Sequence, residues 1–148
     1  IGTERYLGAY FVFSFGRMVS SPPHRIEVAL ATVVRTGPDR MDVRCHEGVK
    51  WTIGGLSELM EARRAVADGT PQRVLVVLPE ELDFELSTMT TGHYDPAELG
   101  KHCRAEAWVV RNTFNARLFE VYFSYFPSPV PTVTFMTEAE ALGWLEEQ

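Results

Sequence analysis

Hydrophobic and polar residues alternate in two segments early in the chain, and a turn separates them. The hydrophobic residues recur at every second position at the start of residues 25–35 and again in residues 41–48, a pattern typical of half-buried strands. The intervening residues 36–40 include Gly, Pro and Asp, which favour tight turns. The two segments therefore predict an antiparallel β-hairpin.

The segment before this hairpin is predicted to be an addition to the domain. Residues 6–18 have the composition of a strand or an extended arm, and residues 19–25 contain two Ser and two Pro, as linkers do. We therefore interpret residues 1–148 as a single domain, with an N-terminal arm and linker over 1–24 and the core over 25–148.

Helical and strand patterns alternate beyond residue 49. Hydrophobic residues at helical spacing predict helices, some with capping residues such as Asp95 and Thr137 at their start, and continuous apolar runs predict strands covered on both faces. The expected helices span residues 54–69, 112–126 and 138–148, and a further, short helix is expected to start at Asp95. The expected strands span residues 73–79, 105–111 and 132–136. This order predicts an α/β fold, in which a mixed sheet of about four to five strands carries packed helices and follows the hairpin and the arm.

The helix predicted over residues 112–126 is apolar around most of its circumference. Its hydrophobic residues form two stripes, one of Phe114, Leu118, Val121, Tyr122 and Tyr125 and the other of Phe119, Phe123 and Phe126. Because only one stripe can pack on the sheet, the other needs a further cover. The second stripe is the candidate interface, covered by the arm or by a second copy in a homodimer, and burial of both stripes in the core is the alternative.

Composition and charge narrow the classes of partner. The 148 residues are 45% hydrophobic with a formal net charge of −6, and the negative charge argues against nucleic acid, which is bound through clustered Lys and Arg. No apolar run is long enough to span a membrane, and no basic segment precedes the apolar residues 10–15, so we expect neither a membrane partner nor a signal peptide. These features favour a cytoplasmic protein in which Cys45 and Cys103 are free thiols.

The sequence contains no recognisable catalytic or cofactor motif. The consecutive residues 45–47 (Cys-His-Glu) and the adjacent pair 102–103 (His-Cys) lack the spacing of metal ligands. The Ser and Cys residues do not stand in hydrolase signatures, and the Gly residues form no phosphate-binding loop. We therefore expect no catalytic residue, no metal and no cofactor, and a binding protein is favoured over an enzyme.

The C-terminal segment resembles the terminal block of a bacterial protein family. In that block a P-x-P-T strand precedes a helix with the pattern F-x-T/S-E-x-E-A-x-x-W-L. The matching residues of this chain are Pro129, Pro131, Thr132, Phe135, Thr137, Glu138, Glu140, Ala141, Trp144 and Leu145. Over roughly residues 25–148 the chain resembles the SpoIIAA-like family of the STAS-related superfamily. The resemblance implies a mixed sheet backed by helices, and it implies relatives that act through protein–protein contacts controlled by phosphorylation of a Ser or Thr.

The resemblance also points to a position for such a phosphorylation. Ser87 and Thr88 lie nearest to the hydroxyl residues of the family's D-S-S-G-like pattern. Leu86 stands in place of its Asp and Met89 in place of its Gly. These differences argue against a retained switch, because they remove the glycine turn that would present a phosphate to free backbone N–H groups.

Residues 85–95 are a candidate ligand site on their own chemistry as well. They are rich in hydroxyl groups, and they place His93 and Tyr94 beside a predicted helix N-terminus, where an anion or a peptide could bind. An ordinary polar loop is the alternative interpretation. The leading functional hypothesis is a non-enzymatic interaction or regulatory module that acts through protein–protein contacts, and the second is a small-molecule-binding protein or minor enzyme with its site under residues 85–95.

Overall fold

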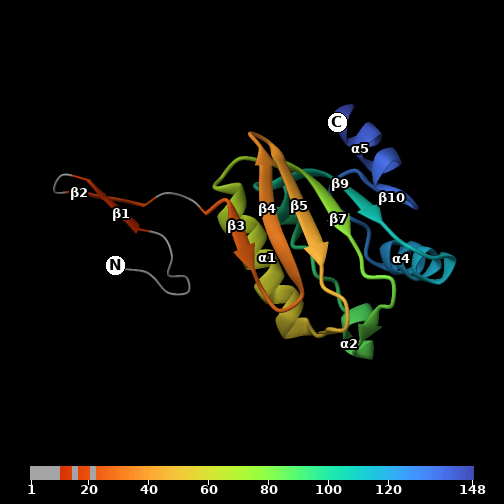
Figure 1. Cartoon of the computed structure of the whole chain (residues 1–148). Helices are drawn as coiled ribbons and strands as arrows, with labels where there is room; N and C mark the ends of the chain where they lie inside the picture. Colours follow the sequence, from red (N-terminus) through yellow and green to blue (C-terminus); the bar gives the residue numbers. More distant parts are fainter. Residues whose placement is uncertain (1–10, 15–16, 21–22) are drawn as a thin grey trace.

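A mixed sheet forms the centre of the protein (Figure 1). The computed structural model describes residues 11–14, 17–20 and 23–148, with side chains from residue 23 onward. The six strands are β3 (Arg25–Glu27), β4 (Ala31–Gly37), β5 (Arg40–Cys45), β7 (Gln72–Val77), β9 (Cys103–Val109) and β10 (Thr132–Phe135). Their order in the sheet is β10-β9-β7-β5-β4-β3; β3, β4 and β5 pair antiparallel, whereas β5, β7, β9 and β10 pair parallel. The predicted α/β class and the mixed sheet are confirmed.

The sheet has more strands than expected because residues 25–35 form two strands instead of one. The chain reverses between β3 and β4, where the Val28 N–H donates to the Ala31 carbonyl at 2.9 Å. Leu30 and Ala31 are consecutive and both buried, so the alternation of exposed and buried positions breaks at this reversal. The hairpin predicted from residues 25–35 and 41–48 is confirmed as β4 and β5.

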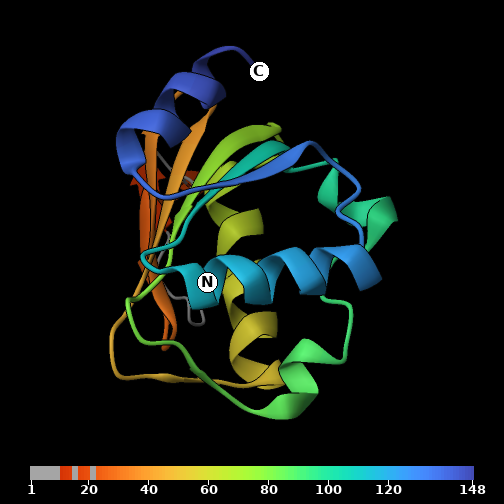
Figure 2. The ribbon, with the colours of Figure 1, turned by 90° about the vertical axis from the view of Figure 1, so that its right-hand side faces the viewer.

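Helices cover both faces of the sheet (Figure 2). α1 (Ile53–Ala67) and α4 (Thr113–Tyr125) lie on one face and enclose the larger part of the hydrophobic core. α5 (Glu138–Glu146) lies on the other face, where Ala141 and Leu145 are buried against β7 and β9. The parallel strands alternate with these helices, as the sequence pattern predicted.

The residues expected to cap helices do so. Thr137 Oγ1 accepts a hydrogen bond from the Glu140 N–H at 3.2 Å, and Asp95 Oδ1 accepts one from the Ala97 N–H at 2.9 Å. The short helix expected to start at Asp95 is confirmed as α3 (Pro96–Leu99), and a turn connects it to β9. The helices expected over residues 54–69, 112–126 and 138–148 are confirmed as α1, α4 and α5.

The segment 85–95 is more structured than a polar loop. It begins beside β8 (Asp83–Phe84), which pairs in parallel with β6 (Lys50–Trp51), and it contains the short helix α2 (Leu86–Met89). The remaining residues of the segment run between α1 and α4 and end at the N-cap of α3. None of the helices in the described part of the chain combines the length and apolar character that a membrane crossing requires.

The orientation of α4 is the reverse of the expected one. Phe119 is only 2% exposed and lies among the tryptophans of the core, with Phe123 packed beside it. Phe114 and Tyr125 are instead 70% and 76% exposed, while Phe126 at the helix end is half-buried. Phe119 and Phe123 were therefore wrong as an interface, because the core of the same chain already covers them.

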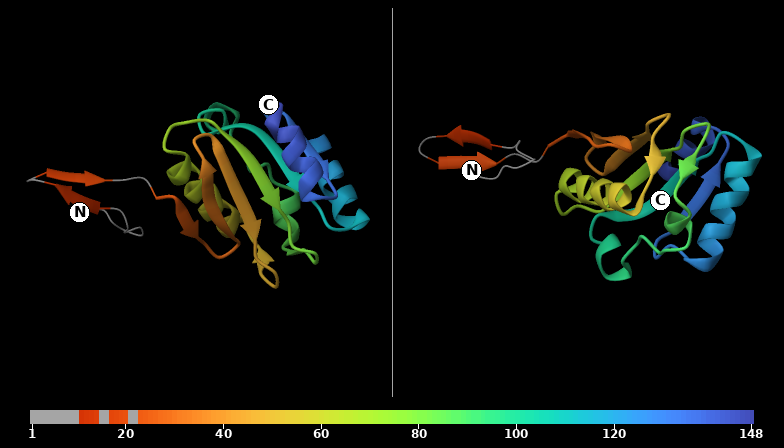
Figure 3. Two further views of the ribbon diagram at one scale, coloured as in Figure 1. Left: turned by 45° about the horizontal axis from the view of Figure 1, so that its top comes forward. Right: turned by 90° about the horizontal axis from the view of Figure 1, so that it is seen from below.

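The described part of the predicted arm forms a small hairpin. β1 (Phe11–Ser14) and β2 (Arg17–Ser20) pair antiparallel, whereas residues 6–10 and 15–16 of the predicted arm lie outside the described residues. In the views of Figures 1 and 3 this hairpin lies beyond β3, at the opposite end of the sheet from α4. The described strands of the arm therefore do not cover α4.

Candidate functional site

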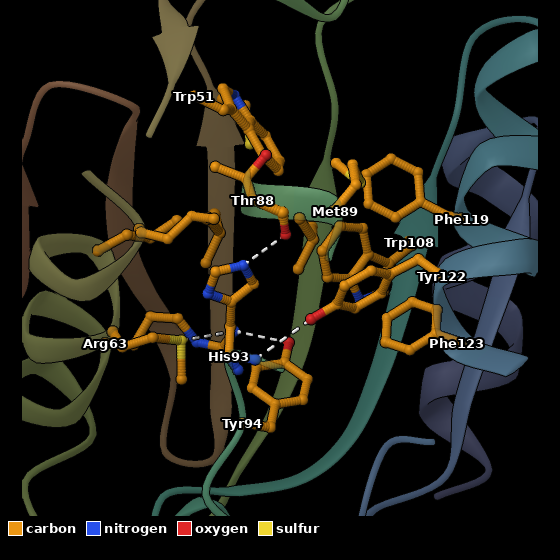
Figure 4. A pocket seen from close by; sticks show the side chains of 16 residues that line it. Trp51, Arg63, Thr88, Met89, His93, Tyr94, Trp108, Phe119, Tyr122 and Phe123 are labelled. Atoms are coloured by element: carbon orange, nitrogen blue, oxygen red, sulfur yellow. Dashed lines mark hydrogen bonds between the residues drawn. The ribbon is translucent and has the colours of Figure 1, made fainter. Parts of the chain in front are cut away.

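The candidate site is a cavity between the sheet, α1, α4 and residues 86–94 (Figure 4). Its volume is about 50 Å³, and its wall is mostly apolar. The sheet and β6 contribute Val43, Cys45, Trp51, Val76 and Trp108; α1 contributes Leu56, Leu59, Met60 and Arg63; α4 contributes Phe119, Tyr122 and Phe123; and the 86–94 segment contributes Thr88, Met89, His93 and Tyr94. Elements distant in sequence thus converge on one space, which only the tertiary fold creates.

A buried ion pair underlies one side of the cavity. Arg63 from α1 and Glu106 from β9 form a salt bridge in which both side chains are almost completely buried. Glu106 Oε1 also accepts hydrogen bonds from the Tyr94 hydroxyl at 2.5 Å and from the Trp108 indole N–H at 2.9 Å. Arg63 Nη1 in turn donates to the Tyr94 hydroxyl oxygen at 3.2 Å. We call these four residues the Arg63–Glu106 network.

The network holds its members in one ionisation state at neutral pH. Burial alone would raise the pKa of Glu106, but the Arg63 charge and the hydrogen bonds lower it below its usual range. Burial alone would lower the pKa of Arg63, but the nearby Glu106 carboxylate has the larger effect and keeps this pKa well above its usual value. Burial and Glu106 both raise the pKa of Tyr94. The ion pair and hydrogen bonds of the network therefore connect α1, β9 and the 86–94 segment. None of its groups has a pKa shifted toward neutral pH, so none is suited to proton transfer.

A second set of hydrogen bonds fastens the 86–94 segment to α4. The Tyr122 hydroxyl donates to the Thr91 carbonyl at 2.9 Å and accepts from the His93 N–H at 3.2 Å. The His93 ring stacks on the Tyr122 ring, with centroids 6.1 Å apart, and its Nε2–H donates to the Thr88 carbonyl at 2.7 Å. Figure 4 shows His93 between Thr88 and Tyr94 at the wall of the cavity. The segment is thereby held against both helices that flank it.

Two donors in the cavity wall lack a partner within the protein. Among the described residues, no acceptor lies within hydrogen-bonding distance of Trp51 Nε1 or Arg63 Nε, and both atoms are buried. A buried donor without a partner costs about 1–3 kcal/mol. Both residues line the cavity, Trp51 from β6 and Arg63 from α1. Both atoms have almost no accessible surface, so a ligand would reach them only after the side chains around them had moved.

The cysteine thiols near the cavity are poor nucleophiles. Burial raises the pKa of the Cys45 thiol to about 12, and burial together with Glu106 raises the pKa of the Cys103 thiol further. Because the thiolate is the reactive form, neither side chain is activated. Both cysteines are free thiols, as expected from the sequence. Within the described residues, no group of three or more His, Cys, Asp or Glu side chains is arranged to hold a metal ion.

The structure separates the four residues proposed for the 85–95 site. Thr88, His93 and Tyr94 all line the cavity, whereas Ser87 is exposed on α2 and takes no part in it. Thr88 is fully buried, and its hydroxyl donates to the Glu85 carbonyl at 2.6 Å. Of the two hydroxyl residues matched to the phosphorylated position, only Ser87 is therefore accessible.

Sequence reasoning missed Arg63, Glu106 and Trp51, although the sequence contains a signal for the two charged residues. Glu106 is a carboxylate inside the apolar strand 105–111, and Arg63 lies on the apolar stripe of its helix. A charged residue in a segment expected to be buried indicates a partner of opposite charge. The two residues are distant in sequence, so the pattern could indicate that each needs a partner but could not identify the pair.

His102 predicts a dependence of stability on pH. Burial, together with the charges of Arg63 and Arg64, lowers the pKa of His102 from 6.5 to about 4. The unfolded chain therefore binds a proton on His102 between pH 6.5 and 4 while the folded chain does not, so stability falls as pH falls through this window. We expect the free energy of unfolding to decrease by about 2 kcal/mol between pH 7 and pH 5.

Chemical denaturation of the wild type and of His102→Gln at the two pH values tests this assignment. The variant is expected to lose clearly less stability on acidification than the wild type. Equal losses in both proteins would show that other groups cause the pH dependence. Glu106 contributes little above pH 5, because the stability from its lowered pKa is lost only as pH falls below the usual carboxyl value of 4.5.

Comparisons of the chain with models of known protein families, with curated proteins and with solved structures found no match.

Proposed function

We propose that the protein is a non-enzymatic binding module that holds a small molecule in the cavity beneath residues 86–94. The observation that carries this proposal is that two residues lining the mostly apolar cavity, Trp51 and Arg63, each hold a buried side-chain donor without a partner among the described residues. A mostly apolar pocket with a few convergent polar groups is the usual form of a small-molecule site. The raised thiol pKa values and the fixed ionisation of the Arg63–Glu106 network favour binding over catalysis.

The cavity restricts the class of ligand by size and charge. Its volume of about 50 Å³ is smaller than the ~150 Å³ of a cavity known to hold benzene. Larger ligands would require the 86–94 segment to move away from α1. Glu106 already neutralises the charge of Arg63, so the site favours a neutral molecule with a short apolar body and one acceptor oxygen over an anion.

An outer groove offers a route to the cavity. It lies between α1 and residues 91–93 and has a volume of about 340 Å³. Leu56, Met60 and His93 line both the groove and the cavity, so these side chains separate the two spaces. A ligand could enter by displacing them, because His93 is held by one side-chain hydrogen bond to Thr88.

The binding proposal predicts a selective response of Trp51 to a small neutral ketone. The probe is 2-butanone, and the measurement is the ¹H–¹⁵N NMR signal of the indole N–H of each of the three Trp residues. The Trp51 signal is expected to shift, because its N–H would donate to the carbonyl oxygen. Trp144, which packs on Phe135 against the opposite face of the sheet, serves as an internal control. A probe of about five non-hydrogen atoms binds with millimolar to micromolar affinity at best.

Two substitutions and a charged probe sharpen this test. Val76→Phe fills the cavity and should abolish the Trp51 shift, whereas Val133→Phe, at a partly exposed position of β10, should leave it unchanged. Butyrate should bind no better than 2-butanone, since the ion pair is already neutral overall. A Trp51 signal that stays constant up to the solubility limit, or that moves equally with Trp144, would rule out the cavity as the binding site.

A second candidate function is an interaction or regulatory module that acts through protein–protein contacts, including a homodimer contact. The exposed apolar side chains of α4 favour it, since a large unpaired apolar surface is typical of a contact site. The resemblance of residues 25–148 to SpoIIAA-like proteins agrees with this hypothesis and with a bacterial cytoplasmic location. The free thiols suit a reducing compartment. Ser87 would be the accessible position for a phosphorylation, which mass spectrometry of the protein isolated from its cells would detect.

A further inference from the structure

Residues 90–93 border the cavity and two open spaces at the surface. The outer groove on the α1 side, of about 340 Å³, is lined by Thr91, Gly92 and His93. A hollow of about 340 Å³ on the α4 side is lined by residues including Met89 and Thr90. His93 lines the cavity as well as the outer groove. The segment therefore has space around it into which it can move.

Few hydrogen bonds hold the centre of this segment. Within the described part of the chain, residues 91–93 take part in no backbone–backbone hydrogen bond. The His93 ring donates to the Thr88 carbonyl of the adjoining α2. The other described hydrogen bonds of residues 91–93 both involve the Tyr122 hydroxyl, which donates to the Thr91 carbonyl at 2.9 Å and accepts from the His93 N–H at 3.2 Å. A segment with so few backbone hydrogen bonds opens at a low free energy.

Both ends of the segment are held more firmly than its centre. On one side Thr88 is fully buried, and its hydroxyl donates to the Glu85 carbonyl at 2.6 Å. On the other side Tyr94 belongs to the Arg63–Glu106 network, in which its hydroxyl donates to Glu106 Oε1 at 2.5 Å. An outward movement is therefore confined to the residues between Thr88 and Tyr94.

The C-terminal end of α4 supports the segment through two aromatic rings. The rings of Tyr122 and Phe126 lie 5.1 Å apart between centroids. The His93 ring stacks on Tyr122, and Gly92 lies so close to Phe126 that a Cβ added at Gly92 would be 3.0 Å from Phe126 Cδ1. Figure 4 shows the Tyr122 hydroxyl pointing toward His93. The rings thus position the segment, and the hydroxyl of Tyr122 supplies its hydrogen bonds to α4.

We propose that residues 90–93 form a lid over the cavity and that the Tyr122 hydroxyl is its latch. When the lid opens, His93 leaves Tyr122 and Thr88 and moves into the outer groove, so that the groove and the cavity become one space. Tyr122 thereby controls how often a ligand can enter or leave. The inference deepens the proposed small-molecule function and rests on it for the cavity as a ligand site, but the opening itself needs no ligand.

The reaction of a buried thiol with iodoacetamide tests the lid. Val76 and Val74 lie on the same face of β7 and are 3% and 0% exposed, but only Val76 lines the cavity. The full chain carries Val76→Cys or, as the matched control, Val74→Cys, and mass spectrometry of peptides separates the introduced thiol from Cys45 and Cys103. Val76→Cys should react at a rate that low concentrations of urea barely change, because opening of the lid exposes little surface. Val74→Cys should react more slowly and only through global unfolding, which urea accelerates steeply.

Removal of the Tyr122 hydroxyl tests the latch. Tyr122→Phe keeps the ring that stacks on His93, and it should accelerate the urea-independent reaction of Val76→Cys by about 10- to 100-fold, because two hydrogen bonds of the closed lid are lost. Tyr125→Phe removes the same atom from a side chain that is 76% exposed and should leave the rate unchanged.

Each part of the inference has its own contrary result. Equal rates and equal urea dependence of Val76→Cys and Val74→Cys would overturn the lid. A urea-independent reaction of Val76→Cys that Tyr122→Phe does not accelerate would overturn the latch. These rates are measured without 2-butanone, so a missing response of Trp51 to that probe would count against the proposed function alone.

Discussion

Replacement of Glu106 by Ala is expected to destabilise the protein by about 3–5 kcal/mol. The substitution would leave the buried guanidinium of Arg63 without its counter-ion, and would also leave the Tyr94 hydroxyl and the Trp108 indole N–H without their acceptor. Leaving a buried charge without its counter-ion is among the most destabilising effects of a single substitution. Urea denaturation at pH 7 measures the change in the free energy of unfolding.

A double substitution at Arg63 and Glu106 tests whether an unpaired buried charge causes the loss of stability. Arg63→Met combined with Glu106→Gln removes both charges at similar side-chain volume, and it should recover most of the stability that either single charge removal loses. Glu98→Ala is the matched control, since it breaks the exposed pair between Glu98 and Lys101 and should cost less than about 1 kcal/mol. A single Glu106→Ala that costs no more than the control would contradict the described burial of the network.

Replacement of Phe119 by Ala is expected to cost about 3–5 kcal/mol, whereas Phe114→Ala should change stability by less than about 0.5 kcal/mol. The two substitutions remove the same atoms from the same helix. Phe119 is 2% exposed and packs against Trp51 and Trp108, with ring centroids 6.3 and 4.9 Å apart, but Phe114 is 70% exposed. The expected difference therefore comes from burial alone.

Thermal and urea denaturation of both variants measure this difference. If the two variants lost equal stability, the orientation of α4 with Phe119 packed in the core would be wrong.

Local sequence patterns predicted most of the longer helices and strands of this fold. The continuous apolar runs predicted β7 and β9, and Thr137 and Asp95 marked the starts of α5 and α3. These predictions hold because capping and strand burial depend on residues close together in the chain. The boundary between β3 and β4 was missed, since the reversal is set by a backbone hydrogen bond and not by a turn motif of Gly or Pro.

The orientation of α4 was beyond the reach of the sequence. Both of its stripes have large apolar side chains at helical spacing, so helix periodicity alone gave no physical ground for choosing the second stripe as the interface. The choice depends on the shape of the space above β7 and β9, which Trp51 and Trp108 define. Packing of side chains from separate elements therefore decided which stripe is buried.

Some features of the candidate site follow from the sequence, and others depend on the tertiary structure. The sequence by itself determined that residues 85–95 carry polar chemistry next to a helix start, and it placed single charged residues, Arg63 and Glu106, within segments that would be buried. Only the tertiary structure joined them, because residues 63 and 106 come from α1 and β9 and meet only once the crossover between the strands has formed. The tertiary structure also decided that His93 and Tyr94 line a cavity while Ser87 is exposed. This placement depends on how α2 packs against α4, and no local sequence pattern encodes that contact.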